Sequence, residues 1–301
     1  MDGGSAVTGS EMLVSTTLPD LPTEILECIL SFADNKDLMV VVTCNSVLRD
    51  LGSRRLYRSL SDQGFSMERT RLMFGVLQSQ PMLASHVRCC QLYLTKYSLP
   101  DTAQSDWNMV ASALKNLRNL RTLKLWVVMC PRWILNDVYF PRLSSLDAYT
   151  PPRPEWSPIT SSFLARHNHL TTLHIKGELE TPFISLPPSA LPRLHVLSVT
   201  NPNHVRLLAG PGRTSLKKVN IYPFSTSVSK APIDGVAPAL EALSKVDGNT
   251  IQEVVLRLES PCDFVSIGRS MTGLLSLRSL ALHCDFKALQ PVSIRKIWSE
   301  C

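Results

Sequence analysis

The amino-acid sequence predicts an α/β protein in which a small three-helix N-terminal part precedes a long array of stacked strands. Three observations lead to this prediction. Apolar residues recur at helical spacing in residues 21–60. A short phrase (apolar, two residues, apolar, one residue, apolar) then recurs along the rest of the chain. Between the phrases, amphipathic stretches alternate with proline-rich gaps, so we expect an irregular array.

The composition argues against several classes of partner. The chain has 301 residues, of which 44% are hydrophobic and 19% charged, which is enough to form a core. Its formal net charge is +6, but lysine and arginine form no run of five or more, so we expect no nucleic-acid partner. No apolar run reaches the length that crosses a bilayer, so we expect no membrane partner.

The cysteines and the first residues indicate a compartment. The eight cysteines form no C-x-x-C pair, and several stand in apolar runs, which is typical of buried thiols rather than of a disulfide framework. Residues 1–17 lack a basic start and a long apolar stretch, which predicts a flexible leader and no signal peptide. We therefore expect a protein of the cytoplasm or the nucleus.

Residues 21–60 carry three helical stretches. Pro22 is tolerated at the start of the first, because an N–H in the first turn has no helical partner. Asp34 or Asn35 is expected to cap the second, and the third is expected to extend to Leu60. A unit of about forty residues buries too little surface to be stable alone. Its apolar surface therefore needs a partner, either the rest of this chain or another protein.

A specific string runs through this segment. It reads Leu21-Pro22-x-Glu24-Ile25-Leu26-x-x-Ile29-Leu30-Ser31-Phe32, followed by Asp37-Leu38 and by Leu56-Tyr57-Arg58-Ser59-Leu60. The string resembles the F-box, most of all in its fungal forms. The resemblance implies an F-box over residues 18–60 that docks on a Skp-type adaptor and, through it, joins a cullin-based ubiquitin ligase.

Carried over by position, the resemblance implies eight adaptor-binding residues. They are Leu21, Pro22, Ile25, Leu26, Ile29, Leu30, Leu38 and Val42. The family often has a tryptophan where this chain has Val47. A smaller side chain buries less area, so the resemblance implies weaker adaptor binding than usual.

The recurring phrase follows a linking segment over residues 61–84, where we expect a helix from Ser66 to Leu77 that ends before Pro81. The phrase begins at Val87, Leu120, Leu143, Leu170, Leu194, Leu216, Ile251 and Leu277. Each phrase ends with the alternation of a strand that has one buried face. No phrase can bury its leucines alone, whereas stacked neighbours can, which predicts a solenoid with a curved parallel sheet over residues 85–301.

The phrase and its spacing resemble the leucine-rich repeat. Starting positions lie between 22 residues (Leu194 to Leu216) and 35 residues (Leu216 to Ile251) apart. The asparagine or cysteine that usually follows the phrase is mostly absent, so the repeats are irregular. Helices are expected at residues 107–117, 163–164, 236–246 and 264–271, with a last one at residues 294–301. The proline clusters at residues 151–154 and 187–188 predict loops.

The residues that alternate with the buried ones are expected to form two outward rows on the sheet. The first row contains Gln91, Lys124, Asp147, His174, Ser198, Asn220, Val255 and Ala281. The second contains Tyr93, Trp126, Tyr149, Lys176, Thr200, Tyr222, Arg257 and His283.

The second row predicts a site for a target protein. Aromatic and arginine side chains carry much of the energy of protein interfaces. We therefore expect Tyr93, Trp126 and Tyr149 to form the centre of the site. The residues Lys176, Tyr222 and Arg257 extend it. The alternative is that aromatic residues stand here only because they suit strands.

Catalytic and metal-binding patterns are weak. Residues 210–215 are glycine-rich but lack the lysine of a phosphate-binding loop. His167, His169 and His174 lie close in sequence, but no cysteine or carboxylate joins them at ligand spacing. We therefore expect no catalytic residue, no metal site and no cofactor.

These observations predict the substrate-receptor subunit of a Skp–cullin–F-box ubiquitin ligase, which is not itself an enzyme. One alternative is an F-box scaffold that binds the adaptor but assembles no ligase. Another is a repeat-built regulator of a GTPase, which would need a functional loop arginine such as Arg153 or Arg213.

Overall fold

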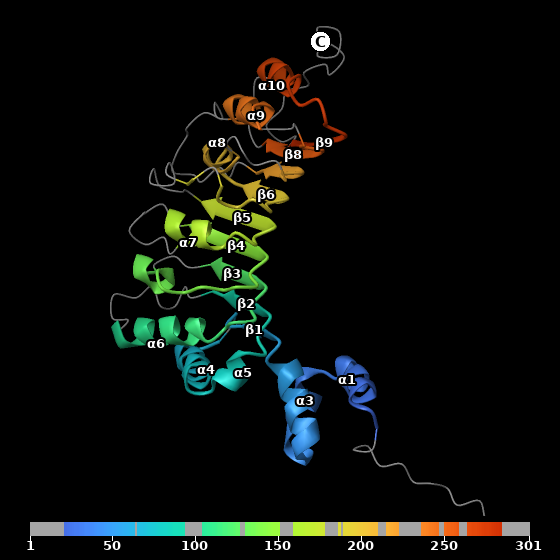
Figure 1. The fold of residues 1–301 in the computed structure, drawn as a ribbon, viewed down its shortest axis with the longest axis vertical. Coiled ribbons are helices and arrows are strands. Elements are labelled where there is room, and N and C mark those ends of the chain that lie inside the picture. Colours follow the sequence, from blue (N-terminus) through green and yellow to red (C-terminus); the bar gives the residue numbers. More distant parts are fainter. Residues whose placement is uncertain are drawn as a thin grey trace, which may run out of the picture. The chain divides into compact units, whose positions relative to one another are not determined.

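The computed structural model describes residues 21–63, 65–93, 104–126, 130–150, 159–177, 186–187, 189–209, 215–222, 236–246, 250–258 and 264–284. The chain divides into two compact units, Met1–Tyr57 and Arg58–Cys301, and Figure 1 gives the element labels. The predicted leader, the predicted last helix and the proline cluster at residues 151–154 lie outside the described residues. In the part that is described, no helix is long and apolar enough to cross a membrane.

The first unit consists of the helices α1 (Thr23–Phe32), α2 (Asn35–Cys44) and α3 (Ser46–Leu56). Asp34 caps α2, since its Oδ1 accepts the backbone N–H groups of Lys36 at 2.8 Å and Asp37 at 2.9 Å. Asn45 caps α3 in the same way, accepting the N–H of Leu48 at 2.8 Å. These side chains satisfy N–H groups that have no partner within their own helix, and so fix where α2 and α3 begin.

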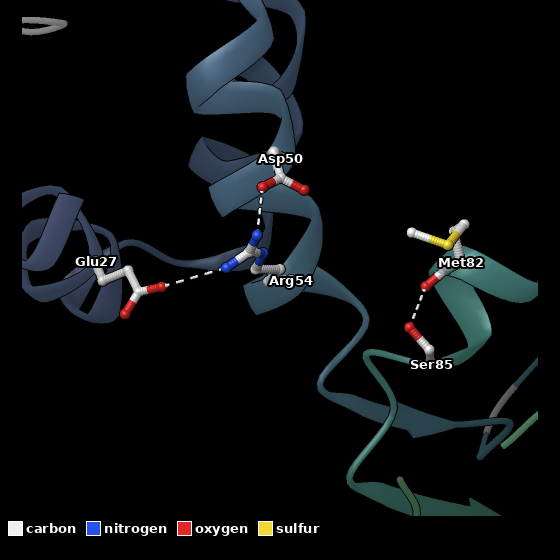
Figure 2. Close-up of polar contacts among 5 residues, drawn as sticks. All are labelled: Glu27, Asp50, Arg54, Met82 and Ser85. Atoms are coloured by element: carbon white, nitrogen blue, oxygen red, sulfur yellow. Dashed lines mark hydrogen bonds and ion pairs between the residues drawn. The ribbon is translucent and has the colours of Figure 1, made fainter. Parts of the chain in front are cut away.

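A small leucine core holds the three helices together. Its buried members are Leu26, Leu30, Leu38 and Leu51. At the surface, Arg54 of α3 lies 2.6 Å from Asp50 Oδ2 and 3.9 Å from Glu27 Oε1 of α1 (Figure 2). These ion pairs are about half exposed, so they contribute little compared with the leucines.

Gly52 of α3 lies directly against valine side chains of α2. A Cβ atom built on Gly52 would lie 2.7 Å from Val42 Cγ1. A glycine-to-alanine change inside a helix normally stabilises by about 0.5–1 kcal/mol. Here the clash reverses the sign, and we expect Gly52→Ala to destabilise the first unit by about 1–3 kcal/mol, as overpacking does.

Gly75 of α4 (Met67–Ser79) provides the matched control. The nearest atom to a Cβ at Gly75 is Met109 Sδ at 4.0 Å, so Gly75→Ala should show the normal stabilising effect. Denaturant titration of both variants, followed by amide exchange in each unit, measures the two effects. Stabilisation by Gly52→Ala would contradict the α2–α3 packing.

The second unit is built on one parallel sheet. Within the described residues, nine strands lie in chain order and each pairs in parallel with the next. They are β1 (Ser59–Ser61), β2 (Cys89–Leu92), β3 (Thr122–Trp126), β4 (Ser145–Thr150), β5 (Thr172–Gly177), β6 (Val196–Val199), β7 (Lys218–Ile221), β8 (Glu253–Leu258) and β9 (Ser279–Cys284). The predicted parallel sheet is therefore confirmed, with the eight recurring phrases forming β2 to β9.

The first strand differs from the prediction. Leu60 was expected to end the third helix, but α3 ends at Leu56 and Leu60 lies in β1. The pairing of Leu60 with Cys90 of β2 places it in the sheet. A three-residue strand is too short to show the alternation that identifies a strand in a sequence. The partner strand decides its conformation.

The connecting helices lie along one side of the sheet (Figure 1). The predicted helices are present as α4, α6 (Gln104–Lys115), α7 (Ser161–Arg166), α9 (Val236–Ser244) and α10 (Phe264–Met271). The structure adds α5 (Pro81–Ala84), the 3-10 helix η3 (Arg132–Leu135) and α8 (Asn203–Leu208). These three are too short for a clear helical period. Each begins at or just after a proline, and a proline in the sequence predicts a loop as readily as the start of a helix.

The core runs between the sheet and these helices. One inward residue from each of seven successive strands is fully buried in it: Cys90, Leu123, Leu146, Leu173, Leu197, Val219 and Val254. Burial raises the pKa of the Cys90 and Cys130 thiols, as expected for cysteines that serve as small core residues. The corresponding residue of β9, Leu280, is 41% exposed, because β9 has only one neighbouring strand in the described sheet.

Candidate functional site

The face of the sheet opposite the helices, called here the open face, carries the two predicted rows. The first row is paired residue by residue from Gln91 in β2 to Ala281 in β9. In the second row, Trp126 pairs with Tyr149 and Tyr149 with Lys176. Tyr93 immediately follows β2. The register of the strands therefore confirms both rows where it is described.

The aromatic end of the second row is a contact cluster. The rings of Tyr93 and Trp126 lie 5.8 Å apart between centroids. Lys176 Nζ stands 4.4 Å from the centroid of the Trp126 ring, and it also lies 3.2 Å from the carboxylate of Asp147. A cation over an indole contributes about 0.5–1 kcal/mol at an exposed site. Trp126 and Asp147 together therefore fix the position of the lysine ammonium.

A pocket of about 360 Å³ opens beside this cluster. The described residues that line it are Trp126, His174, Ile175, Lys176, Ser198, Val199, Thr200, Tyr222 and Arg257. We call it the β5–β8 pocket. It contains four of the six predicted target-binding residues, whereas Tyr93 and Tyr149 lie outside its lining. The concavity is thus displaced from the predicted aromatic centre toward the later strands.

His174, Ser198 and Thr200 belong to the predicted rows but were not predicted as target-binding residues. That prediction relied on aromatic and cationic side chains, and the type of a side chain does not indicate the depth of the surface around it. Ser198 is small and lies between larger neighbours, so the surface is hollowed at this point. In the sequence, the feature that indicates the pocket is therefore the short side chain of Ser198 between those of His174 and Asn220 in the first row.

Buried polar atoms without a hydrogen bond gather on this face. In the described part of the chain they include Trp126 Nε1 and Asn220 Oδ1. Each such atom costs about 1–3 kcal/mol, and such groups are rare unless a site uses them. Burial lowers the pKa of the neighbouring His174, and Lys176 and Lys124 lower it further against the opposing effect of Asp147. The histidine therefore favours its neutral form.

The histidines that lie close in sequence do not form a site. His167 is buried in the core, where its Nδ1 donates to the carbonyl of Phe163 at 2.7 Å and its Nε2 accepts the N–H of Phe140 at 3.0 Å. Burial lowers the pKa of His167 to about 4. His174 stands on the open face instead. Among the described residues, no group of three or more histidine, cysteine or acidic side chains could hold a metal ion.

The adaptor-binding residues implied by the resemblance divide into two classes. Ile25 is 48% exposed, Ile29 is 46% exposed and Pro22 is also exposed, while Leu21 and Val42 are half-buried. Leu26, Leu30 and Leu38 are at most 6% exposed. The expectation that these three face a partner is corrected, because their side chains form the core of the first unit.

Other apolar side chains extend the surface of the first unit. Phe32 is 86% exposed, and Met39, Val40 and Val47 are each at least 45% exposed. In α1 the apolar residues form one broad stripe, so the sequence period alone did not show which edge of the stripe faces inward. Val47 also lines a groove of about 370 Å³ together with Thr23, Ser46, Asp50, Leu51 and Arg54. We call Ile25, Ile29, Phe32, Met39, Val40 and Val47 the exposed apolar set.

The remaining functional predictions concern residues that the structure does not describe. The loop arginines Arg153 and Arg213 lie there, as does the glycine-rich stretch at residues 210–214. Comparison with protein-family models and with curated proteins finds no match to this chain.

Proposed function

We propose that this protein is the substrate-receptor subunit of a Skp–cullin–F-box ubiquitin ligase. In this proposal, α1–α3 bind a Skp-type adaptor and the open face of the sheet binds the target protein. The observation that carries it is the exposed apolar set on α1–α3. Six large apolar side chains face solvent on a unit whose own core contains only four buried leucines among its described residues. Such a surface on so small a unit is typical of a docking site.

The residue string narrows the kind of partner. The exposed Pro22, Ile25 and Ile29 belong to the string that resembles the F-box, and the resemblance implies a Skp-type adaptor. The second unit supports the receptor role. Parallel strands in chain order, with an aligned ladder of buried residues, are what an irregular leucine-rich-repeat-like solenoid would form, and such proteins bind partners on the exposed sheet.

The proposed activity needs no catalytic residue in this chain. A receptor that holds its target beside a ubiquitin-loaded partner converts an encounter between separate molecules into one within an assembly. The high effective concentration then raises the rate of transfer. What this chain supplies is two binding surfaces, one on each of its two units.

Co-purification with a Skp-type adaptor and a cullin tests the proposal. Ile25→Asp combined with Ile29→Asp should reduce adaptor capture about tenfold or more, because a carboxylate in an apolar interface lacks a partner. Met82→Asp is the matched control. Met82 is 76% exposed in α5 of the second unit, where its carbonyl accepts Ser85 Oγ at 2.7 Å (Figure 2).

A variant that should bind the adaptor more tightly tests the same surface. Val47→Trp restores the residue that the family often has and should strengthen adaptor capture, because the larger side chain buries more apolar area. Unchanged capture in both the aspartate and the tryptophan variants would remove the adaptor from the proposal. Adaptor without cullin in the purified complex would support a scaffold instead.

A separate double variant tests whether the open face binds target proteins. Trp126→Ala combined with Tyr149→Ala should retain the adaptor and lose the proteins that accumulate when the proteasome is blocked. An unchanged set of captured proteins, with the sheet still folded, would show that the open face does not bind targets.

A further inference from the structure

We propose that four arginines at the beginning of strands β1–β4 form a binding surface for a short acidic segment of a partner protein. They are Arg58, Arg88, Arg121 and Arg142, called here the arginine cluster. All four belong to the second unit and lie outside the open face and the exposed apolar set. This surface is therefore separate from the two that the proposed function uses.

The sheet brings the four residues together. Arg88 donates its backbone N–H to the carbonyl of Arg58 at 2.9 Å, and Arg121 donates to the carbonyl of Arg88 at 2.8 Å. The N–H of Ser144 bonds to the Arg121 carbonyl at 2.9 Å, and Arg142 stands two residues before that serine. In the sequence the first three arginines lie 30 residues (Arg58 to Arg88) and 33 residues (Arg88 to Arg121) apart, so no run of basic residues indicates the cluster.

The alternation of the strands separates the cluster from the open face. Arg88 stands two positions before the buried Cys90, whereas Gln91 belongs to the outward row. Arg121 stands in the same place before the buried Leu123. Side chains of this set lie on the helix side of the sheet. Arg121 is nevertheless exposed and Arg88 half-buried, so they lie at the edge of the core and in reach of solvent.

The guanidinium groups lie close enough to repel one another. Burial lowers the pKa of Arg88, and the neighbouring cations Arg121, Arg142 and Arg58 lower it further. All four stay charged at neutral pH. Among the residues that the structure describes, none of the four forms an ion pair with a carboxylate. Like charges held together without a counter-charge are unfavourable, and an anionic partner would relieve their repulsion.

Two other arginines show the contrast with a structural role. Arg71 of α4 lies 2.6 Å from the carboxylate of Asp106 in α6, and Arg54 lies 2.6 Å from that of Asp50. Each of these arginines has its counter-ion within its own unit. The arginine cluster has none in the described chain, so its charge is available to another molecule.

The extent of the cluster fits a short acidic peptide. Neighbouring strands lie about 4.8 Å apart, so β1 to β4 span about 15 Å, which is the length of four or five extended residues. The cluster ends there, because Ser144 and Thr171 hold the same place before β4 and β5. Guanidinium groups bind carboxylates through two parallel hydrogen bonds. A nucleic-acid duplex needs a broader basic surface, since even single DNA-binding modules bury about 600–1,000 Å².

Peptide binding by the full-length chain, measured by fluorescence anisotropy, tests the inference. Two labelled peptides carry five glutamates or five glutamines between the same glycine–serine flanks. We expect the glutamate peptide to bind about tenfold or more tightly than the glutamine peptide, with an affinity that falls as salt rises. An oligothymidylate with five phosphates carries a similar charge. Tighter binding of this oligonucleotide than of the glutamate peptide would overturn the choice of an acidic protein segment.

Two double variants with the same change of net charge assign the binding to the cluster. Arg121→Gln with Arg142→Gln should weaken binding of the glutamate peptide about tenfold. Arg193→Gln with Lys217→Gln should leave it unchanged. Both control residues are exposed; Arg193 stands between a proline and a leucine as Arg142 does, and Lys217 precedes β7 as Arg121 precedes β3.

Thermal unfolding of the same samples separates binding from folding. The Arg121–Arg142 variant should be at least as stable as the wild type, because the substitutions remove repulsion between exposed like charges. Destabilisation would show that these arginines hold the fold, and would contradict the inference. Equal affinities for the two peptides, or equal affinities of the two double variants, would also overturn it.

Discussion

Leu38→Ala is expected to unfold residues 21–57 while the parallel sheet stays folded. Leu38 is 1% exposed in a core with only four buried leucines among the described residues. Truncating a buried leucine costs about 2–5 kcal/mol. A single core in a unit of this size rarely supplies more than about 3–5 kcal/mol. The expected loss therefore equals most of the stability that this unit has.

Amide hydrogen exchange resolves the two units within one sample. In Leu38→Ala, the amides of α1–α3 should lose their protection and those of β3–β5 should keep it. Met39→Ala is the control, because Met39 is the next residue of α2 and is 62% exposed, so its change should stay within about 0.5 kcal/mol. Retained protection of α1–α3 in Leu38→Ala would mean that the leucine core is not what holds them together.

The same variants separate two ways of losing the proposed adaptor. If the proposal holds, Leu38→Ala should lose adaptor binding because the helices unfold. Ile25→Asp combined with Ile29→Asp should lose it while α1–α3 keep their protection, because both isoleucines are exposed. The proposed docking surface and the core beneath it thus give different exchange patterns with the same binding result.

Acidification from pH 7 to pH 5 is expected to destabilise the second unit by about 2 kcal/mol for each of two buried histidines. Burial lowers the pKa of His167 and of His204 to about 4. The unfolded chain keeps a histidine pKa of about 6.5 and so binds more protons than the folded chain between pH 6.5 and pH 4. Stability is therefore fully present above pH 6.5 and falls as the pH falls through this window.

Denaturant titrations at several pH values check the slope. His167→Gln removes one titrating group while an amide can still donate to the Phe163 carbonyl and accept from the Phe140 N–H. We expect this variant to be less stable than the wild type at pH 7, because the ring also packs 4.2 Å from that of Phe163, centroid to centroid. Its stability should nevertheless depend about half as steeply on pH. A slope equal to that of the wild type would show that His167 does not titrate in this window.

Much of the second unit could be predicted from local pattern. A strand with one buried face must alternate, so each phrase shows which of its residues face inward, and neighbouring phrases then align. This is why the outward row from Gln91 to Ala281 was predicted residue by residue. The β5–β8 pocket was not predicted, because its depth depends on the relative sizes of side chains on different strands.

Two histidines also show that sequence spacing does not predict which side chains come together. His167 and His174 lie seven positions apart in the sequence. The former joins α7 to the segment before β4, and the latter faces the opposite side of the sheet. Spacing along a chain does not measure distance between side chains when a turn and a strand lie between them.

By itself the sequence determined that this is an α/β protein with three short helices before a parallel sheet, because apolar periodicity is a local property that each segment displays alone. Only the tertiary structure decided that Leu26, Leu30 and Leu38 point inward while Ile25 and Ile29 face solvent. A helix with a broad apolar stripe can turn either edge of that stripe toward its neighbours. The packing of α2 and α3 against α1 selects the side that is buried, and no pattern within α1 contains that choice.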